Sequence, residues 1–313
     1  MAIYALRRVV IGIPLVIGVS LMVFMILHLL PGNPVAAALA GSPATPAAIR
    51  KLEVQYGLNR PLWTQYWDFV VHAVHGNLGQ SFTTGQSVSG LIGSQLGASV
   101  QLTVAALVLT AVLGIAGGVV AAVRQGGRLD QLLRVLSIWG SSMPQFWTGI
   151  MLIILLSFTF HLFPSSGTGG LNYLFLPAVS LALASTGIVV RVVRNATLET
   201  LGQPYVTALE AKGLSQRAII GRHVLRNALI PAITVIGVQV GGLLSGAVIV
   251  ENVFGRQGIG SLLVNAIEQK NYPLVEGLML VISVVYVVVN VIVDISYAYL
   301  DPRVRTTMSE GRR

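Results

Sequence analysis

The sequence predicts an all-helical protein that crosses a membrane several times. The chain has 313 residues, of which 54% are hydrophobic and only 10% are charged, whereas a soluble domain carries about 25% charged residues. Long uncharged runs alternate with short polar segments, and about 20 apolar residues suffice for a helix to cross the hydrocarbon core. Each backbone polar group inside a bilayer needs a partner within its own segment, which favours helices, and no alternating strand pattern competes with them.

Six segments are long and apolar enough to span the bilayer. The first follows the Arg7-Arg8 pair and exceeds the apolar core of a signal peptide, so we expect a retained transmembrane helix. The third contains Pro144, which predicts that it starts as a separate short helix. The predicted spans are about 9–30, 99–123, 136–163, 171–190, 228–250 and 277–299.

The basic residues predict the orientation of these spans. Fifteen of the 20 lie in the N-terminal end, the loops after the second and fourth spans, and the C-terminal tail. The positive-inside rule therefore assigns both termini and these two loops to the cytoplasm, and residues 31–98 and 251–276 to the outside. The net charge of +9 thus reflects topology and predicts no nucleic-acid partner, because the basic residues do not cluster on a soluble face. Cysteine is absent, which excludes disulfides and thiolate chemistry.

The outer segment 31–98 is too long for a simple connector. Thr45 as N-cap, Pro46 at the first position and Gly57 beyond the end predict a short helix from Ala47 to Tyr56. An aromatic cluster at 63–69 follows. It suits an interfacial belt and equally a surface that meets an external partner, and both interpretations stay open.

Small residues are frequent in spans two to five, which predicts close contacts between helix backbones. Six spans make only half of a plausible pore, so we expect a partner chain. No internal repeat is evident, which argues against the inverted-repeat architecture of many secondary transporters.

A polar, basic segment lies between the fourth and fifth spans, and its residues 205–226 are called here the cytoplasmic handle. Tyr205 to Lys212 are compatible with a short helix, and Gly213 tolerates a left-handed turn. Ser215 is placed to cap a second helix that runs toward Pro231. Composition also allows an amphipathic connector that lies on the lipid headgroups with snorkelling arginines.

The residue pattern of this segment resembles a known family. Glu210-Ala211-Lys212-Gly213, followed after a spacer by Asn227-Ala228-Leu229-Ile230-Pro231, resembles the EAA loop of ABC importer membrane subunits, with Lys212 where that pattern often has Ala. Stretches along nearly the whole chain are similar to the B-type subunit of dipeptide/oligopeptide permeases. They are LRRVVIGIPLVIGVSLMVFMILHLLPGNP, YGLNRPLWTQY, GNLGQSF, SSMPQFWTGI, VIVENVFG and YLDPRVR. Arg256-Gln257 depart from this family, which often has Trp-Pro there.

The resemblance implies a type I, binding-protein-dependent permease fold in a bacterial inner membrane. Residues 1–95 would hold the first span and an outer segment, 96–300 the permease core, 205–226 the coupling helices and 301–313 a cytoplasmic tail. The implied partners are a second homologous permease subunit, two ATP-binding subunits or domains that carry ATP and magnesium, an extracytoplasmic substrate-binding protein, and membrane lipid. The chain itself would bind no cofactor and no metal.

The implied function is import of dipeptides or short oligopeptides, although relatives of the family also carry nickel or haem. By analogy, Glu210 and Gly213 couple the chain to the ATPase, supported by Ala211 and Arg217. The translocation path should be lined by small and polar side chains. The candidates are Ser141, Ser142, Gln145, Gln239 and Ser245.

Two other classes of protein fit the sequence less well. An ion-driven carrier needs ionisable groups within the bilayer, and Asp294, in the sixth span, lies near its cytoplasmic end. A membrane enzyme needs a catalytic constellation, and the five histidines show no HExxH spacing. His72 and His75 lie three residues apart and could bind a metal if helical. No GxxxxGK[ST] loop occurs, so we expect the chain not to hydrolyse ATP itself.

Overall fold

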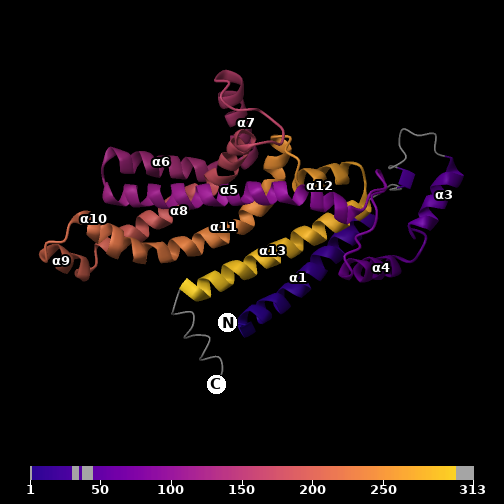
Figure 1. Ribbon diagram of the computed structural model, residues 1–313, viewed down its shortest axis with the longest axis horizontal. Coiled ribbons are helices and arrows are strands. Elements are labelled where there is room, and N and C mark those ends of the chain that lie inside the picture. The colour runs from indigo at the N-terminus through magenta and orange to yellow at the C-terminus, as the bar shows by residue number, and fades with distance from the viewer. Residues whose placement is uncertain (1, 30–34, 37–44, 301–313) are drawn as a thin grey trace. The chain divides into compact units, whose positions relative to one another are not determined.

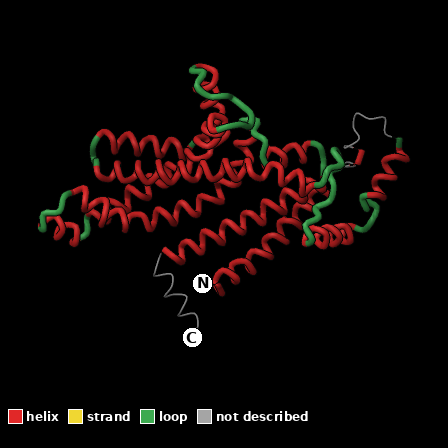
Figure 2. The backbone as a smooth tube through the Cα atoms, in the orientation of Figure 1, coloured by secondary structure: helices red, strands yellow, loops and turns green. Residues whose placement is uncertain are grey.

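The computed structural model describes residues 2–29, 35–36 and 45–300, and the predicted tail 301–313 lies outside them. Within the described part, helices carry the fold, and only an isolated bridge between Gln80 and Ser87 has strand character (Figure 2). The chain divides into two compact units, which are described separately. The first combines 1–99 with 257–288, and the second combines 100–256 with 289–313.

The first unit contains α1 (Ala2–Leu29), α3 (Pro46–Gln55), α4 (Leu62–Val74), the start of α5 (Val88–Val123), α12 (Ile259–Glu268) and most of α13 (Tyr272–Leu300). Within this unit α1 and α13 lie side by side (Figure 1), and a Cβ on Gly12 would collide with Val287. The apolar core of the unit includes Leu27, Val88, Ile92, Leu263 and Leu278.

The outer segment contains more helix than predicted. The predicted helix at 47–56 is confirmed as α3, and Gly57 after it has a φ of +70°, a conformation that glycine adopts readily. The aromatic cluster forms the additional helix α4. Trp63 and Trp67 on it are exposed, whereas the Tyr66 hydroxyl lies 2.9 Å from Ser20 Oγ on α1.

The second predicted span begins earlier than expected, at Val88 instead of residue 99. Val88 and Ile92 are buried in the core of the first unit, and Gly277 leaves room for Val88 against α13. Burial of these side chains outweighs the cost of the glycines in this first part of the helix, each of which disfavours helix by about 1 kcal/mol relative to Ala.

The second unit contains the rest of α5, α6 (Arg128–Ser142), α7 (Gln145–Leu152), the π-helix η1 (Ile153–Thr159), α8 (Leu171–Leu201), the handle, and α11 (Leu225–Val253). Helix α8 packs against both α6 and α11 (Figure 1). Glycines allow the close crossings: Gly187 of α8 lies against the Ser137 carbonyl of α6, and Gly118 of α5 lies against Val193 of α8. The small residues of the sequence therefore serve backbone approach.

Five described helices are long and apolar enough to cross a membrane, and a bent pair makes a sixth candidate. The pair joins α6 to α7 and η1 with a bend of 111°. Pro144 causes the break, because proline lacks an N–H donor and pushes the preceding residue out of the helical region. Met143 accordingly has an extended backbone (φ −88°, ψ 134°). The prediction that Pro144 separates a short helix is confirmed.

Candidate coupling site

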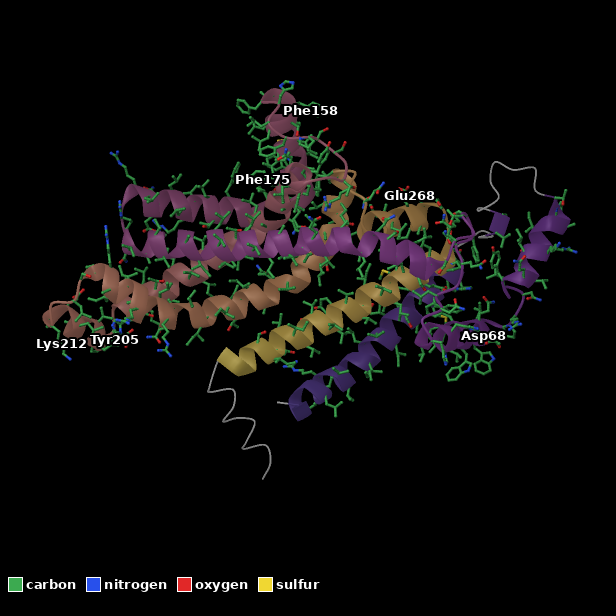
Figure 3. The ribbon with its side chains drawn as sticks, in the orientation of Figure 1. Asp68, Phe158, Phe175, Tyr205, Lys212 and Glu268 are labelled. Carbon is green, nitrogen blue, oxygen red and sulfur yellow. The ribbon has the colours of Figure 1, made fainter. Side chains whose placement is uncertain are left out.

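The cytoplasmic handle folds into α9 (Pro204–Ala211), the single turn α10 (Gln216–Ala218) and the π-helix η2 (Ile219–Val224). In Figure 3 the labels mark Tyr205 on α9 and Lys212 directly after this helix. They lie at the end of the second unit where α8 ends and α11 begins. The two-helix arrangement predicted from the sequence is confirmed in outline. The second helix differs, because it runs without a break into α11 and forms one helical segment from Gln216 to Val253.

Gly213 ends the first helix of the handle. Its φ is +81°, and its N–H donates to the Glu210 carbonyl at 2.8 Å. The next N–H, from Leu214, donates to the Leu209 carbonyl at 3.2 Å. These two bonds form a Schellman motif, which satisfies the last carbonyl groups of a helix and reverses the chain direction.

Ser215 begins the second helix as predicted. Its Oγ accepts a hydrogen bond from the Ala218 N–H at 3.4 Å, which satisfies one of the unpaired donors of the first turn. The π-helix that follows was not predicted. Its i→i+5 hydrogen bonding brings Ile219 and Val224, five residues apart, to the same side, and both side chains are buried.

A small apolar core holds the handle together. Val206 of α9 packs with Ile219 and Val224 of η2, and Leu209 and Leu214 border this cluster. The cluster joins α9 to the base of α11 across the turn at Gly213. The handle is therefore a packed unit and differs from an extended connector.

Two polar contacts reinforce this packing. Gln216 Nε2 donates to the Glu210 carboxylate at 2.6 Å, which bridges the end of α9 and the start of α10. Asn227 Nδ2 donates to the Tyr205 hydroxyl at 3.0 Å, which bridges the start of α9 and the first turn of α11. The two helices are thus tied at both ends.

The four residues predicted to couple lie close together along the chain at the turn of the handle. Glu210, Ala211 and Gly213 occupy the end of α9 and its turn, Arg217 lies on α10, and all four are exposed. The handle also exposes further basic side chains, and within the described part of the chain none of them forms an ion pair. These are Lys212, Arg222 and Arg226.

The residues predicted to line a path lie at two places in the second unit. Ser141 and Ser142 end α6 just before the bend, and both hydroxyls donate to the Ile138 carbonyl. Gln145 begins α7, and its side-chain amide lies against Gly246 of α11. The packing of α7 on α11 thus brings Gln145 next to the region of Ser245.

The remaining predicted path residues differ in exposure. The Ser245 hydroxyl is exposed and donates to the Gly241 carbonyl at 3.2 Å. Gln239 lies about two turns earlier on α11 and is half-buried. The structure therefore groups Gln145 with the Ser245 region and leaves Gln239 further along the helix.

Three acidic residues that the structure buries were not predicted from the sequence: Asp130, Glu251 and Glu276. Asp130, in the first turn of α6, accepts two hydrogen bonds from Arg194 of α8. Glu276 lies in the first two turns of α13 and is 9% exposed, although it had been assigned to the outer loop. The available signals were weak: Asp130 is the one acidic residue among the arginines of its loop, and Glu276 directly precedes an apolar run.

Arg256, where the sequence departs from the resembled family, is buried beyond the end of α11. It is 1% exposed, and its Nη2 donates to Gln101 Oε1 of α5 at 2.9 Å. Its N–H donates to the Glu251 carbonyl at 2.8 Å. Burial lowers the pKa of the Arg256 guanidinium, while the Glu251 charge opposes this shift. Arg256 therefore makes an interior contact with α5, whereas Gln257 beside it is exposed.

A metal site receives no support from the described residues, among which no group of three or more His, Asp and Glu could hold an ion. His72 and His75 lie at the end of α4. Their Nδ1 atoms lie 2.6 and 2.8 Å from the Asp68 and Val71 carbonyls, so both rings face their own helix.

Comparisons with known proteins agree with these features. The family described as "Binding-protein-dependent transport system inner membrane component" matches residues 114–306, and its N-terminal counterpart matches residues 1–103. The dipeptide transport system permease protein DppB of Escherichia coli K12 is 34% identical over 333 residues, covering 96% of this chain and 98% of that protein.

Two further similarities are consistent with this match. The glutathione transport system permease protein GsiC of Escherichia coli O6:H1 is 34% identical over 302 residues, covering 96% of this chain and 98% of that protein. The MetNI methionine ABC transporter, solved in an inward-facing conformation, contains a chain with a TM-score of 0.58 at 16% identity. The match covers 67% of this chain and 96% of that chain, which supports the fold.

The matches span nearly the whole sequence, and the described part has five helices long and apolar enough to cross a membrane, with a bent pair as a sixth candidate. ATPase and substrate-binding-protein partners accompany a component of this kind. The chain belongs to the binding-protein-dependent transport system inner membrane components and is a multi-pass permease subunit of a bacterial ABC importer, without an ATPase domain of its own.

Proposed function

We propose that the chain, paired with a second homologous permease subunit, forms the translocation path of an importer for dipeptides or short oligopeptides. The observation that carries this proposal is the cytoplasmic handle, a packed and exposed helix pair between two helices long enough to span the membrane. Relatives that are 34–36% identical over nearly the whole chain bear the name dipeptide permease, which supports the cargo class.

The handle is the proposed binding surface for an ATP-hydrolysing subunit. Coupling needs an element that both sites bias between two arrangements. Helix α9 follows α8 after a short turn, and α10 continues into α11. A displacement of the handle therefore reaches two spans directly. The Schellman turn and the apolar cluster keep the handle stiff, so little of that displacement is absorbed within it.

The coupling residues have distinct proposed roles. Gly213 sets the turn between the two helices, and Glu210 fixes that turn through Gln216. Ala211 leaves the surface accessible to close approach by a partner. Arg217 presents an exposed charge on α10 for a partner carboxylate.

The proposed path runs along the polar and small residues near the α6–α7 bend and on α11. Ser141, Ser142 and Gln145 lie on either side of the bend, and Ser245 directly precedes Gly246, against which the Gln145 side chain lies. Gln239 extends this set toward the cytoplasmic end of α11. A peptide path of this kind is tolerant, because small and polar side chains offer hydrogen bonds without a tight pocket.

Uptake by the reconstituted complex tests the proposal. The chain is co-purified with the proteins that leave the membrane with it and placed in proteoliposomes with ATP. We expect ATP-dependent uptake of a labelled dipeptide. Uptake of nickel or haem in its place would reassign the cargo, and uptake that follows an ion gradient without ATP would contradict the mechanism.

Two variants test the role of the handle. Gly213→Pro removes the N–H that donates to Glu210, and Glu210→Arg replaces the acceptor of the Gln216 bond. Both should remain in the membrane and lose most dipeptide uptake together with transport-linked ATP hydrolysis. Glu199→Gln, an exposed change on α8 before the handle, should retain both activities. Normal transport by the two handle variants would show that the coupling assignment is wrong.

A further inference from the structure

A cavity of about 360 Å³ lies within the first unit. It is bordered by residues of α1, α3, α4, the loop before α5, and the start of α13. All of these belong to one compact unit, on the side that the arginine distribution assigns to the outside. Its volume falls in the range of small-molecule sites, about 300 to 1,000 Å³.

Glu276 gives this cavity its chemical character. The residue lines the cavity and is 9% exposed. Among the described residues, none forms an ion pair with its carboxylate and none donates a hydrogen bond to it. A buried carboxylate without a partner is unfavourable, and a cationic ligand would supply the missing partner.

The basic groups that line the same cavity are already engaged. Arg60 pairs with Asp68 at 2.9 Å on the rim. The His28 ring lies with Nδ1 2.9 Å from the Phe24 carbonyl and Nε2 3.3 Å from Gln65 Oε1. His72 faces its own helix. None of these groups pairs with Glu276, so its carboxyl group remains available to a ligand.

The other walls favour an ammonium group over an anion or a metal ion. Aromatic rings line the cavity, and their faces attract ammonium ions. They belong to Phe24, Tyr56, Phe69, Phe82 and Tyr272. Amide side chains of Gln55, Gln65, Asn77 and Gln80 offer additional hydrogen bonds. Two carboxylates line the cavity, but Asp68 is paired with Arg60, and no cluster of three metal-ligating residues occurs among the described residues, so the cavity is a poor metal site.

We propose that this cavity binds a primary ammonium group on Glu276, supplied by the amino terminus of a short peptide or by the headgroup of phosphatidylethanolamine. The ammonium donates three hydrogen bonds, of which the carboxylate accepts at least one. The peptide source rests on the function proposed above, whereas the lipid source stands without it. Asp68, labelled in Figure 3, lies on the rim of this site.

Binding to the purified full-length chain tests the peptide source. The chain is placed in nanodiscs of phosphatidylcholine and phosphatidylglycerol, which contain no primary amine, and titrated by calorimetry with L-alanyl-L-alanine. N-acetyl-L-alanyl-L-alanine, which lacks the ammonium, is the matched ligand control. We expect the free dipeptide to bind and the acetylated one to bind at least tenfold more weakly.

The lipid source is tested in a second arm. The Tm of the chain is measured in nanodiscs with phosphatidylethanolamine and in nanodiscs where phosphatidylcholine replaces it, since the quaternary ammonium of phosphatidylcholine has no N–H donor. A higher Tm with phosphatidylethanolamine supports the lipid source. If only one of the two arms shows a preference for the ammonium-bearing probe, that probe is the source of the ammonium group. If both arms show it, the site accepts the peptide amino terminus and the lipid headgroup alike.

Glu276→Gln tests the site itself in both arms. It keeps the shape of the side chain and removes its charge, so binding of the dipeptide should weaken at least tenfold and the lipid-dependent rise in Tm should vanish. Glu268→Gln is the matched control, because Glu268 is exposed at the end of α12 and does not line the cavity (Figure 3).

The proposal is overturned if Glu276→Gln behaves like the unchanged protein in both arms. It is also overturned if the unchanged protein shows no preference for the ammonium-bearing probe in either arm, a comparison that needs no variant to fold. ATP-dependent dipeptide uptake is measured separately. Ammonium binding without dipeptide uptake would refute the proposed cargo and support the site at Glu276. Dipeptide uptake without ammonium binding would support the proposed cargo and refute the site.

Discussion

Arg194 of α8 makes two hydrogen bonds to the Asp130 carboxylate of α6. Its Nε donates to Oδ1 at 2.7 Å, and its Nη2 donates to Oδ2 at 2.9 Å. Asp130 also accepts the Gly126 N–H at 3.0 Å. Arg134 lies 3.6 Å from the same carboxylate but is exposed. The bidentate pair therefore joins the predicted cytoplasmic ends of two helices and orders the loop before α6.

Asp130→Asn should lower the Tm of the purified protein. The amide leaves the Arg194 guanidinium without its charge partner, and one of its two acceptor positions becomes a donor. Arg134→Gln, which removes only the exposed and longer contact, should change the Tm little. Thermal unfolding in detergent compares the two. If both substitutions lowered the Tm equally, Asp130 would act only through its negative charge, and the bidentate bond to Arg194 would add nothing.

Substitutions at Gly213 should follow the tolerance of each residue for a positive φ. The φ of +81° costs a residue with a Cβ about 1–2 kcal/mol, while no other atom lies within 4 Å of a Cβ at this site. Asn adopts this conformation more readily than Ala, and Val does so least. Dipeptide-stimulated ATP hydrolysis by the complex should therefore fall in the order Gly, Asn, Ala, Val. An activity order that followed side-chain volume instead would point to a contact with the partner.

Gly187→Ala should destabilise the protein by about 1–3 kcal/mol, the usual cost of an added group in a packed region. The new Cβ would collide with the Ser137 backbone carbonyl, which cannot move without displacing α6. Gly242→Ala is the control, because a Cβ there meets no atom within 4 Å. It should be neutral or stabilising by up to about 1 kcal/mol through helix propensity. Unfolding free energies in detergent would distinguish them, and a harmless Gly187→Ala would disprove the close α6–α8 crossing.

Arg256→Met should destabilise the second unit by about 1.5–3 kcal/mol, since it removes a charged hydrogen bond to Gln101 from the interior. Arg256→Lys should not restore stability, because a single ammonium group cannot reproduce the forked guanidinium donors. The measurement is the free energy of unfolding of each variant. Full stability of Arg256→Met would mean that the contact between α5 and the end of α11 is dispensable.

The local chemistry of the handle was predictable from the sequence. Gly213 has the positive φ that the sequence anticipated, and Ser215 accepts from the first turn of the second helix. Pro144 breaks its helix, and Pro46 begins one. Such features depend on a few neighbouring residues, whose backbone preferences act whatever the rest of the chain does.

Contacts between distant residues were not predictable in this way. Asp130 and Arg194 are 64 positions apart, and the sequence around either residue does not indicate that the two form an ion pair. The early start of α5 depends on Val88 packing against Gly277, and the π-helix η2 depends on burying Ile219 and Val224 with Val206. Each of these outcomes requires a partner from another helix.

The amino-acid sequence by itself determined the membrane-spanning class and the two-helix character of the handle, and it predicts the orientation from its arginines. Composition, charge distribution and local backbone preference suffice for these properties. Only the tertiary structure decided that Glu276 faces a cavity and that Arg256 is interior. The physical reason is that the burial of a side chain depends on which residues surround it in space. The chemistry of the side chain itself does not specify those neighbours.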